Sequence, residues 1–467
     1  MNIVHTNALN PLAYSASELA TRIRDGDLSP VDVVEAHIAR IEATNGALNA
    51  LVRPTFEQAR HEAQVAANSE PVGPLHGVPF TVKDSLAVAG IPATSGLISR
   101  SEYRPAQDAP VVARLRQAGA ILLGKTNTPD NCWAQETDNP LFGLTKNPLD
   151  VMRSVGGSSG GEAAIIAAGG SPLGIGSDIA GSIRLPAAFT GIVGLRPTSG
   201  LLAEEGHWPA AEGRLADLES VGPMARRVED VALAFDVMRG VPPTRRSTTI
   251  LGGQRVVWWM SDGLLPASPA IQRGIERAVE ALQRVGMRAS KKVFSAQLFA
   301  NVGWTAYLGT TEREAIARGF GNGEAWSPAA ELTRMLRGAP RVSPGALFYW
   351  LFSHYGSTAL NWMGIDGAAW RATLRQQFLD LVGKNGIAVC PIFPTTAPPH
   401  GWSLATIAPL TLTSYQTWVN LAGLCALVVP VGFNGHGMPV GIQLVAAPYA
   451  EDALLAAGAV VQRQRES

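Results

Sequence analysis

The chain has 467 residues, of which 46% are hydrophobic and 16% are charged, and its formal net charge is zero. This composition is typical of a folded globular protein and excludes an intrinsically disordered chain. Zero net charge argues against nucleic acid as the main partner, because binding phosphates requires a basic surface. The three cysteines lie far apart in the sequence. Their spacing fits neither a disulfide framework nor a zinc site, so we expect buried thiols in a reducing compartment.

Residues 1–70 are expected to form peripheral helices. Ser15 and Glu18 have the spacing of a capping box, and Ser29 with Pro30 marks the start of a second helix. The first residues lack the basic and apolar regions of a signal peptide, and the apolar runs are far shorter than the ~20 residues that span a bilayer. We therefore expect a cytoplasmic protein without a transmembrane segment.

Residues 71–240 alternate between strand and helix patterns. The expected strands are 78–83, 120–124, 172–176 and 192–195, and the expected helices are 160–168 and 228–238. The run at 120–124 is apolar throughout, as a strand buried on both faces requires. Strands that alternate with helices predict an α/β fold with a covered, largely parallel or mixed sheet.

Strand patterns return near the end of the chain, at 387–391, 427–430 and 440–444, before a final helix at 450–462. Residues 294–400, which include the first of these strands, are rich in tryptophan and carry none of the glycine-rich motifs of the earlier region. We interpret 294–400 as a variable segment folded over the substrate pocket. The whole chain, 1–467, is then a single domain with 71–240 as its core.

Glycine and serine are concentrated between residues 154 and 199. Ser158 lies within the sequence GGSSGG, and Ser182 lies within DIAGSIR. Glycine destabilises regular elements, so this density indicates turns in which backbone amides approach another group closely.

The motifs GGSSGGEAA and GSDIAGSIRLPA closely resemble the signature of the amidase signature family of serine hydrolases. The resemblance extends back to GVPFTVKD, GKTNTPD and ETDNPLFG, and forward to GLRPTSG, SVGPMARRVED and GMPVGIQLV. These motifs occur in order over most of the chain. The resemblance implies one large mixed, largely parallel sheet with helices on both faces, and no cofactor.

The resemblance also implies a Ser-cisSer-Lys triad. Ser182 matches the nucleophile, Ser158 matches the bridging serine on a cis peptide after Gly157, and Lys83 matches the base. A serine hydroxyl needs a base before it attacks a carbonyl carbon. Lysine serves as a base only in its neutral form, which burial among apolar residues favours.

The loop before Ser182 is expected to form an oxyanion hole from the backbone N–H groups of Ile179, Ala180, Gly181 and Ser182. The alternative from spacing alone is a plain glycine turn before a helix. Ala180 departs from the glycine that many members carry here, and Ser177-Asp178-Ile179 departs from the threonine-containing versions of the tRNA-linked amidotransferase subunits. We expect structural support from Asp178, Ser159 and Arg184, with Asp178 acting either on the loop amides or as a simple helix cap.

The substrate pocket is expected to include Cys132 and Trp133, which follow GKTNTPD, together with Gly157 and Ser177. The alternative for Cys132 and Trp133 is ordinary core packing. A catalytic Cys132 is disfavoured because the sequence indicates no partner histidine. The eight histidines form no pairs at metal-ligand spacing, so no metal is expected.

Three functions compete. The leading hypothesis is hydrolysis of an amide or carbamate C–N bond in a small apolar or aryl substrate, with water as co-substrate and a monomer or homodimer as the working form. A second is an amidotransferase subunit, against which Ile179 and the aromatic segment argue. A third is a non-catalytic binding protein on this fold, against which the complete set of Lys83, Ser158 and Ser182 argues. A variant of the first is an α/β-hydrolase esterase, because Ser158 also fits the G-x-S-x-G elbow. That motif needs a hydrophobic strand before it, and residues 147–150 indicate a turn.

Overall fold

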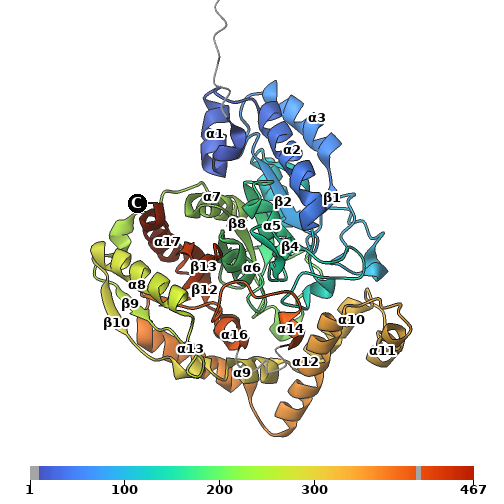
Figure 1. The fold of residues 1–467 in the computed structure, drawn as a ribbon, viewed down its shortest axis with the longest axis vertical. Helices are drawn as coiled ribbons and strands as arrows, with labels where there is room; N and C mark the ends of the chain where they lie inside the picture. Colours follow the sequence, from blue (N-terminus) through green and yellow to red (C-terminus); the bar gives the residue numbers. More distant parts are fainter. Residues whose placement is uncertain (1–9, 406–411, 467) are drawn as a thin grey trace, which may run out of the picture.

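The computed structural model describes residues 10–405 and 412–466. Three helices precede the main body: α1 (Ala16–Arg24), α2 (Pro30–Leu48) and α3 (Phe56–Ala67). Ser15 and Glu18 form the predicted capping box at the start of α1, and Pro30 begins α2. These helices lie together at one end of the molecule, as Figure 1 shows.

A single sheet of eleven strands runs through the described residues, in the order β1-β3-β2-β6-β8-β7-β12-β13-β11-β9-β10. Its strands are β1 (Leu51–Pro54), β2 (Pro79–Lys83), β3 (Ile121–Thr126), β6 (Leu173–Ser177), β7 (Val193–Arg196), β8 (Val221–Ala225), β9 (Arg255–Trp258), β10 (Arg288–Lys291), β11 (Ile387–Cys390), β12 (Cys425–Phe433) and β13 (Pro439–Ala446). Strand β2 pairs in parallel with β3 and β6, and β9 pairs in parallel with β10 and β11. The strands between these two groups pair antiparallel, so the sheet is mixed.

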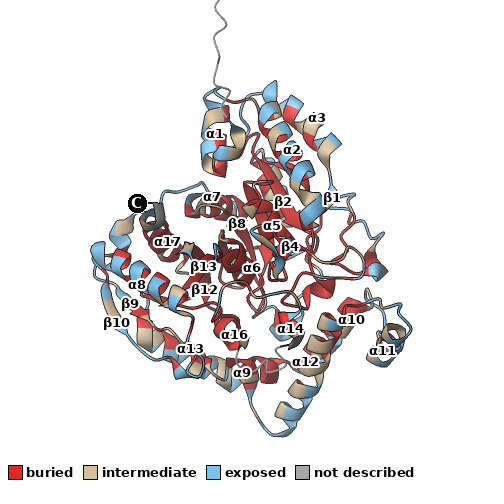
Figure 2. Ribbon diagram, viewed as in Figure 1, coloured by how far each residue is buried: buried red, intermediate tan, exposed pale blue. Residues whose placement is uncertain are grey.

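Helices cover both faces of the sheet, which confirms the predicted fold class. One face packs against α2, α3, α5 (Gly160–Ala167) and α6 (Arg184–Thr190), and the other against α1, α4 (Pro110–Gln117), α7 (Val228–Arg239), α8 (Pro269–Arg284) and α17 (Glu451–Glu466). Strand β3 supplies Ile121 and Leu123 to the first core and Leu122 to the second, because successive side chains of a strand point to opposite faces. The buried residues in Figure 2 are concentrated along this sheet and its inner helices.

A third core is formed largely by the tryptophan-rich residues 294–400, called here the aromatic segment, and by the helix α16 (Ser414–Ala422) that follows them. It contains residues of α9 (Ala300–Tyr307), α10 (Thr310–Phe320), α12 (Pro344–Trp362), α13 (Gly367–Val382) and α16. Helix α11 (Pro328–Leu336) lies farther out, at the edge of the molecule in Figure 1. Tryptophan rings are prominent in this packing. The ring centroids of Trp259 and Trp418, for example, lie 5.8 Å apart. This core extends the molecule beyond the sheet.

Among the helices that the structure describes, none has both the length and the apolar character required to cross a membrane.

Candidate active site

Lys83 is the last residue of β2 and is fully buried. Its strand lies between β3 and β6, and Phe80 and Val82 point into the apolar core. The Lys83 Nζ lies 2.6 Å from Ser158 Oγ and 2.9 Å from Ser177 Oγ. The amine of Lys83 therefore faces two hydroxyl groups in a site closed to bulk water.

Ser158 lies in the glycine-rich turn that leads into α5. The peptide bond between Gly157 and Ser158 is cis, as the resemblance implies. The next residue joins this turn to the loop that carries Ser182, because the Ser159 N–H donates to the carbonyl oxygen of Ser182 at 3.0 Å. The Ser159 hydroxyl also donates to the carbonyl oxygen of Ser177 at 3.2 Å. Ser159 thus holds the two serine-bearing turns against each other.

The loop between β6 and α6 carries Ser182 and is organised by Asp178. Its carboxylate accepts hydrogen bonds from the N–H groups of Gly181 at 2.8 Å and Ile183 at 3.1 Å, and it lies 3.0 Å from the guanidinium of Arg184. Burial alone would raise the pKa of Asp178, but Arg184 and Arg196 outweigh it and hold the pKa well below its usual range. Asp178 therefore holds the loop through its amides and through an ion pair, whereas a simple helix cap would bind helix amides alone.

The backbone amides of this loop separate into two groups. The Gly181 N–H points at Asp178, which differs from the expectation that it faces an oxyanion, because the carboxylate engages it. The N–H groups of Ile179, Ala180 and Ser182 donate to no other residue that the structure describes. These three residues also line the cavity in front of Ser182.

Gly181 has a conformation that only glycine adopts readily, with φ at +104°. A Cβ built at this position would lie 2.5 Å from the side-chain oxygen of Gln416. Both observations explain why the loop requires glycine immediately before Ser182.

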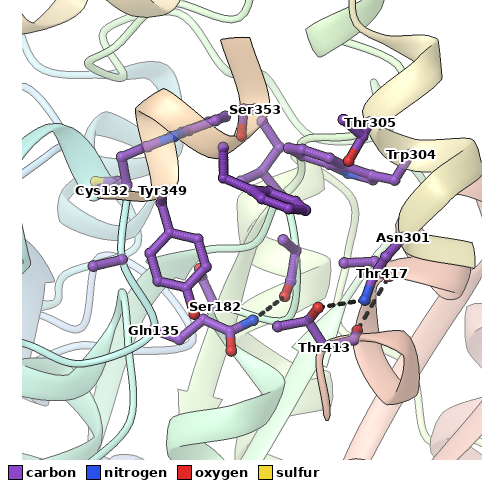
Figure 3. A pocket seen from close by; sticks show the side chains of 15 residues that line it. Cys132, Gln135, Ser182, Asn301, Trp304, Thr305, Tyr349, Ser353, Thr413 and Thr417 are labelled. Atoms are coloured by element: carbon purple, nitrogen blue, oxygen red, sulfur yellow. Dashed lines mark hydrogen bonds between the residues drawn. The ribbon is translucent and has the colours of Figure 1, made fainter. Parts of the chain in front are cut away.

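The cavity in front of Ser182 is mainly apolar and aromatic, and Figure 3 shows its side chains. Its lining comes from the core and from the aromatic segment: Cys132, Trp133, Ala134, Gln135, Ile179, Ala180, Ser182, Asn301, Trp304, Thr305, Tyr349, Phe352, Ser353, Thr413 and Thr417. Asn301 is hydrogen-bonded to Thr413 and Thr417 at one side of this cavity. The remaining wall offers a ligand mostly rings and methyl groups.

Two of the four residues expected in the pocket line this cavity, and two do not. Cys132 and Trp133 line it. Gly157 instead packs against the backbone behind the lining, where an added Cβ would lie 3.0 Å from the carbonyl oxygen of Ala134. Ser177 lies beneath the site, because its hydroxyl is held by Lys83 and by His207, whose Nε2 is 2.9 Å away.

Cys132 does have a histidine nearby, contrary to the inference from the sequence. Its Sγ lies 3.4 Å from the hydroxyl oxygens of Ser95 and Thr128. Burial disfavours the thiolate, but the hydrogen bond and charge of His207 and the hydrogen bond of Ser95 act in the opposite direction and lower the pKa of the Cys132 thiol. His207 belongs to the GHWP sequence, which is no part of the motifs quoted above, so no sequence signal linked it to Cys132.

Ser158 does not have the surroundings of a nucleophile elbow. The strand before it, β5 (Asp150–Ser154), pairs with β4 (Lys146–Asn147) in a separate two-stranded sheet. Ser158 is 1% exposed and is absent from the cavity lining, whereas Ser182 lines it. The geometry exposes Ser182 to the cavity and places Ser158 in contact with Lys83.

Comparisons with known proteins agree with this geometry. The family model named Amidase matches residues 32–455. The chain is 34% identical to fatty-acid amide hydrolase 2-B of Danio rerio, over 94% of this chain and 87% of that protein. It is 32% identical to a glutamyl-tRNA(Gln) amidotransferase subunit of Carboxydothermus hydrogenoformans, over 94% and 95%. A solved structure of 6-aminohexanoate cyclic dimer hydrolase with its substrate is similar with a TM-score of 0.80 and 29% identity, over 97% of both chains.

Proposed function

Because this chain belongs to the amidase family, we propose that it hydrolyses the C–N bond of a small amide through an acyl-enzyme on Ser182. The observation that carries the proposal is the contact of 2.6 Å between Lys83 and Ser158, next to a serine that opens into a cavity. A buried lysine amine paired with a serine hydroxyl has the arrangement of a base and its relay.

Acylation begins when the Ser182 oxygen attacks the amide carbon. The Ser182 proton moves to the Ser158 oxygen, while the proton of Ser158 moves to the neutral amine of Lys83. The negative charge that forms on the substrate oxygen is stabilised by the N–H groups of Ile179, Ala180 and Ser182, which other described residues leave free. The C–N bond then breaks, and the proton returns from Lys83 through Ser158 to the departing nitrogen.

Deacylation uses the same groups with water in place of the amine. Water loses a proton through Ser158 to Lys83 and attacks the ester carbon, and the Ser182–carbon bond breaks. The proton then returns to the Ser182 oxygen. The acid leaves and the enzyme regains its starting protonation state, so the cycle consumes one amide and one water.

The lining of the cavity favours an apolar or aryl acyl group. Trp133, Trp304, Tyr349 and Phe352 surround the space in front of Ser182, and their rings offer a large apolar contact surface. Aryl carbamates present a carbonyl carbon of similar shape and enter the same scheme. We infer that amides are the main substrates and that activated carbamates and esters react as well.

The amidotransferase function stays the second candidate, because a relative with that name covers nearly the whole chain. A cavity walled by aromatic rings suits an apolar acyl group better than the carboxamide of a glutaminyl group. Isolation of the chain with stably bound partner proteins from its own cells would favour this second function.

The test is a screen of acyl p-nitroanilides against the purified protein, with matched p-nitrophenyl esters and aryl carbamates. We expect release of nitroaniline from aryl or medium-chain acyl p-nitroanilides, and little release of ammonia from glutamine. Ser182→Ala is the control and should release none. Glutaminase activity without anilide hydrolysis would contradict the proposal.

A further inference from the structure

A chain of hydrogen bonds continues behind Lys83, on the side away from the cavity. Ser177 Oγ lies 2.9 Å from Lys83 Nζ and 2.9 Å from His207 Nε2. The other ring nitrogen of His207 lies 2.9 Å from a carboxylate oxygen of Glu219. All four side chains belong to buried residues. The catalytic scheme above uses neither His207 nor Glu219.

We propose that His207 and Glu219 are positioning residues, an ion pair whose positive end faces Lys83 and keeps the Lys83 amine neutral. This inference rests on the proposed function, because it concerns the base of that reaction.

The surroundings of His207 define where its protons are. Its Nδ1 lies 2.9 Å from the carbonyl oxygen of Pro209 and 2.9 Å from Glu219, and both are acceptors, so Nδ1 carries a proton. Burial disfavours a second proton, but Glu219 and Cys132 outweigh it and raise the pKa of His207 to about 10. From the 2.9 Å contact with the buried Glu219 carboxylate we infer that His207 is an imidazolium at neutral pH, with its Nε2–H donating to the Ser177 hydroxyl.

The effect of the His207–Glu219 ion pair on Lys83 depends on which of its two charges lies closer to the Lys83 amine. His207 and Glu219 together carry no net charge, but the cation is separated from Lys83 by a single hydroxyl group, while the carboxylate lies on the far side of the ring. A second positive charge on Lys83 is unfavourable at this range inside a protein. The neutral amine is therefore favoured without a net charge being buried.

The hydrogen-bond directions support the same state. Ser177 accepts one hydrogen bond from His207 and has a second lone pair for an N–H of Lys83. The lone pair of the neutral Lys83 nitrogen is then left to face Ser158, which has the proton to be taken. Ser177 thus orients the amine toward its partner in the relay.

Other titratable groups also act on His207 and have to be held constant in a test. They come from separate elements: Cys132 from the loop after β3, and Glu204 from the segment just before His207. Burial and the charge of Glu219 raise the pKa of Glu204 to about 8. Variants of Glu219 and His207 leave both of these side chains in place.

The main experiment measures kcat/KM for a p-nitroanilide from about pH 6 to about pH 10 in the parent and in Glu219→Gln. The substituted glutamine side chain is not charged, so His207 loses the anion that favours its second proton, while its Nδ1–H keeps the Pro209 carbonyl oxygen as an acceptor. We expect the acid limb of the kcat/KM profile to shift to higher pH by about one to two units, because Lys83 then keeps its proton to higher pH. At the alkaline end, kcat/KM should be close to that of the parent. An acid limb that coincides with the parent's would overturn the inference.

Two further variants separate this effect from a loss of structure. His207→Gln removes the same charge and should move the limb in the same direction, and combining it with Glu219→Gln should add no further shift. Glu451→Gln removes another buried carboxylate, which accepts hydrogen bonds from Thr198 away from this chain of hydrogen bonds, and should leave the limb unmoved. An equal shift of the acid limb in Glu451→Gln would show that the loss of any buried carboxylate changes the profile, and would overturn the inference.

A measurement without substrate makes the two proposals separable. Nitrogen-15 NMR of the histidine rings, assigned with His207→Gln, should show both ring nitrogens of His207 protonated at neutral pH. A neutral His207 ring there would overturn this inference and leave the proposed function intact. A parent protein that a fluorophosphonate probe fails to label at Ser182 would overturn both.

Discussion

The floor of the site and its cover differ in how their polar groups are satisfied. The floor consists of Lys83, Ser158, Ser177 and the loop 178–184, which carries Gly181 and Ser182. Its side-chain hydrogen bonds and ion pairs tie two strand ends to two helix starts. The cover consists of the cavity-lining residues of α9, α12 and α16. It combines the rings of Trp304, Tyr349 and Phe352 with a hydrogen-bonded group around Asn301.

The cover leaves some polar atoms without a partner. The indole nitrogens of Trp133, at the edge of the cover, and of Trp304 and Trp350 in the aromatic core form no hydrogen bond with any residue that the structure describes. A network of directed bonds tolerates little displacement, whereas apolar packing tolerates exchange of one ring or methyl group for another. We therefore propose that the floor determines whether the reaction occurs and that the cover determines which acyl groups react.

The largest expected effect concerns the base in the floor. Lys83→Ala should lower kcat/KM for an anilide by about 10³-fold or more, because Ser182 loses the group that accepts its proton. The loss on the matched p-nitrophenyl ester should be smaller, since that leaving group departs without a proton. Lys83→Arg should not restore activity, because a guanidinium stays protonated. Equal losses on both substrates would assign Lys83 a structural role instead.

The next effect concerns the turn that presents the nucleophile. In Gly181→Ala the new methyl group meets Gln416 and the φ of +104° becomes strained, so kcat should fall by about 10²-fold as the loop amides shift. Gly200→Ala is the matched control, since its φ is +76° but no atom lies within 4 Å of the added Cβ. Similar kcat values for the two variants would show that the floor is more tolerant than its hydrogen bonds indicate.

A smaller effect is expected from the cover. Trp304→Ala enlarges the cavity, so the ratio of kcat/KM for long and short acyl anilides should change by about 10-fold in favour of the long ones. Trp326→Ala removes a ring of the same segment that stacks on Phe320 outside the cavity lining, and its ratio should match the parent's. An unchanged ratio in Trp304→Ala would remove the cover from substrate selection.

The smallest effect concerns a buried carboxyl group below the floor. Glu162 accepts hydrogen bonds from Thr81 and Thr126, and Gly174 leaves room for it, since a Cβ there would overlap its carboxyl group. Burial raises the pKa of Glu162 from 4.5 to about 8. The unfolded chain therefore releases this proton first, and folding stability falls as the pH rises through that window.

Glu162→Gln keeps the shape of the side chain and has no proton to release. Chemical unfolding at about pH 5 and about pH 9 should show that the parent loses more stability between the two conditions than the variant does. Identical losses would mean that Glu162 is ionised in the folded protein.

The sequence motifs were sufficient to predict the parts of the floor that lie within them. The resemblance carried by GVPFTVKD, GGSSGGEAA and GSDIAGSIRLPA selected Lys83, Ser158 and Ser182, and the alternation of strand and helix patterns predicted the fold class. Such motifs are readable because a local turn and its catalytic side chain lie within a few residues of each other.

Contacts between distant segments could not be predicted. His207 and Glu219 meet Ser177 only through the pairing of β6 with β8 and the loop before it, and no local pattern marks them. Helix α12 is apolar on most of its circumference, so its periodicity did not indicate that Tyr349 and Phe352 face the cavity. These positions depend on how the chain folds back over the sheet.

The most direct test of the account is to identify the atom that carries the acyl group. The protein is mixed with an aryl carbamate, whose carbamoyl-serine is hydrolysed slowly, quenched in acid, digested and mapped by mass spectrometry. The account predicts one carbamoyl group on the peptide that contains Ser182, absent in Ser182→Ala. A carbamoyl group on Ser158 or Cys132 in the parent would contradict it.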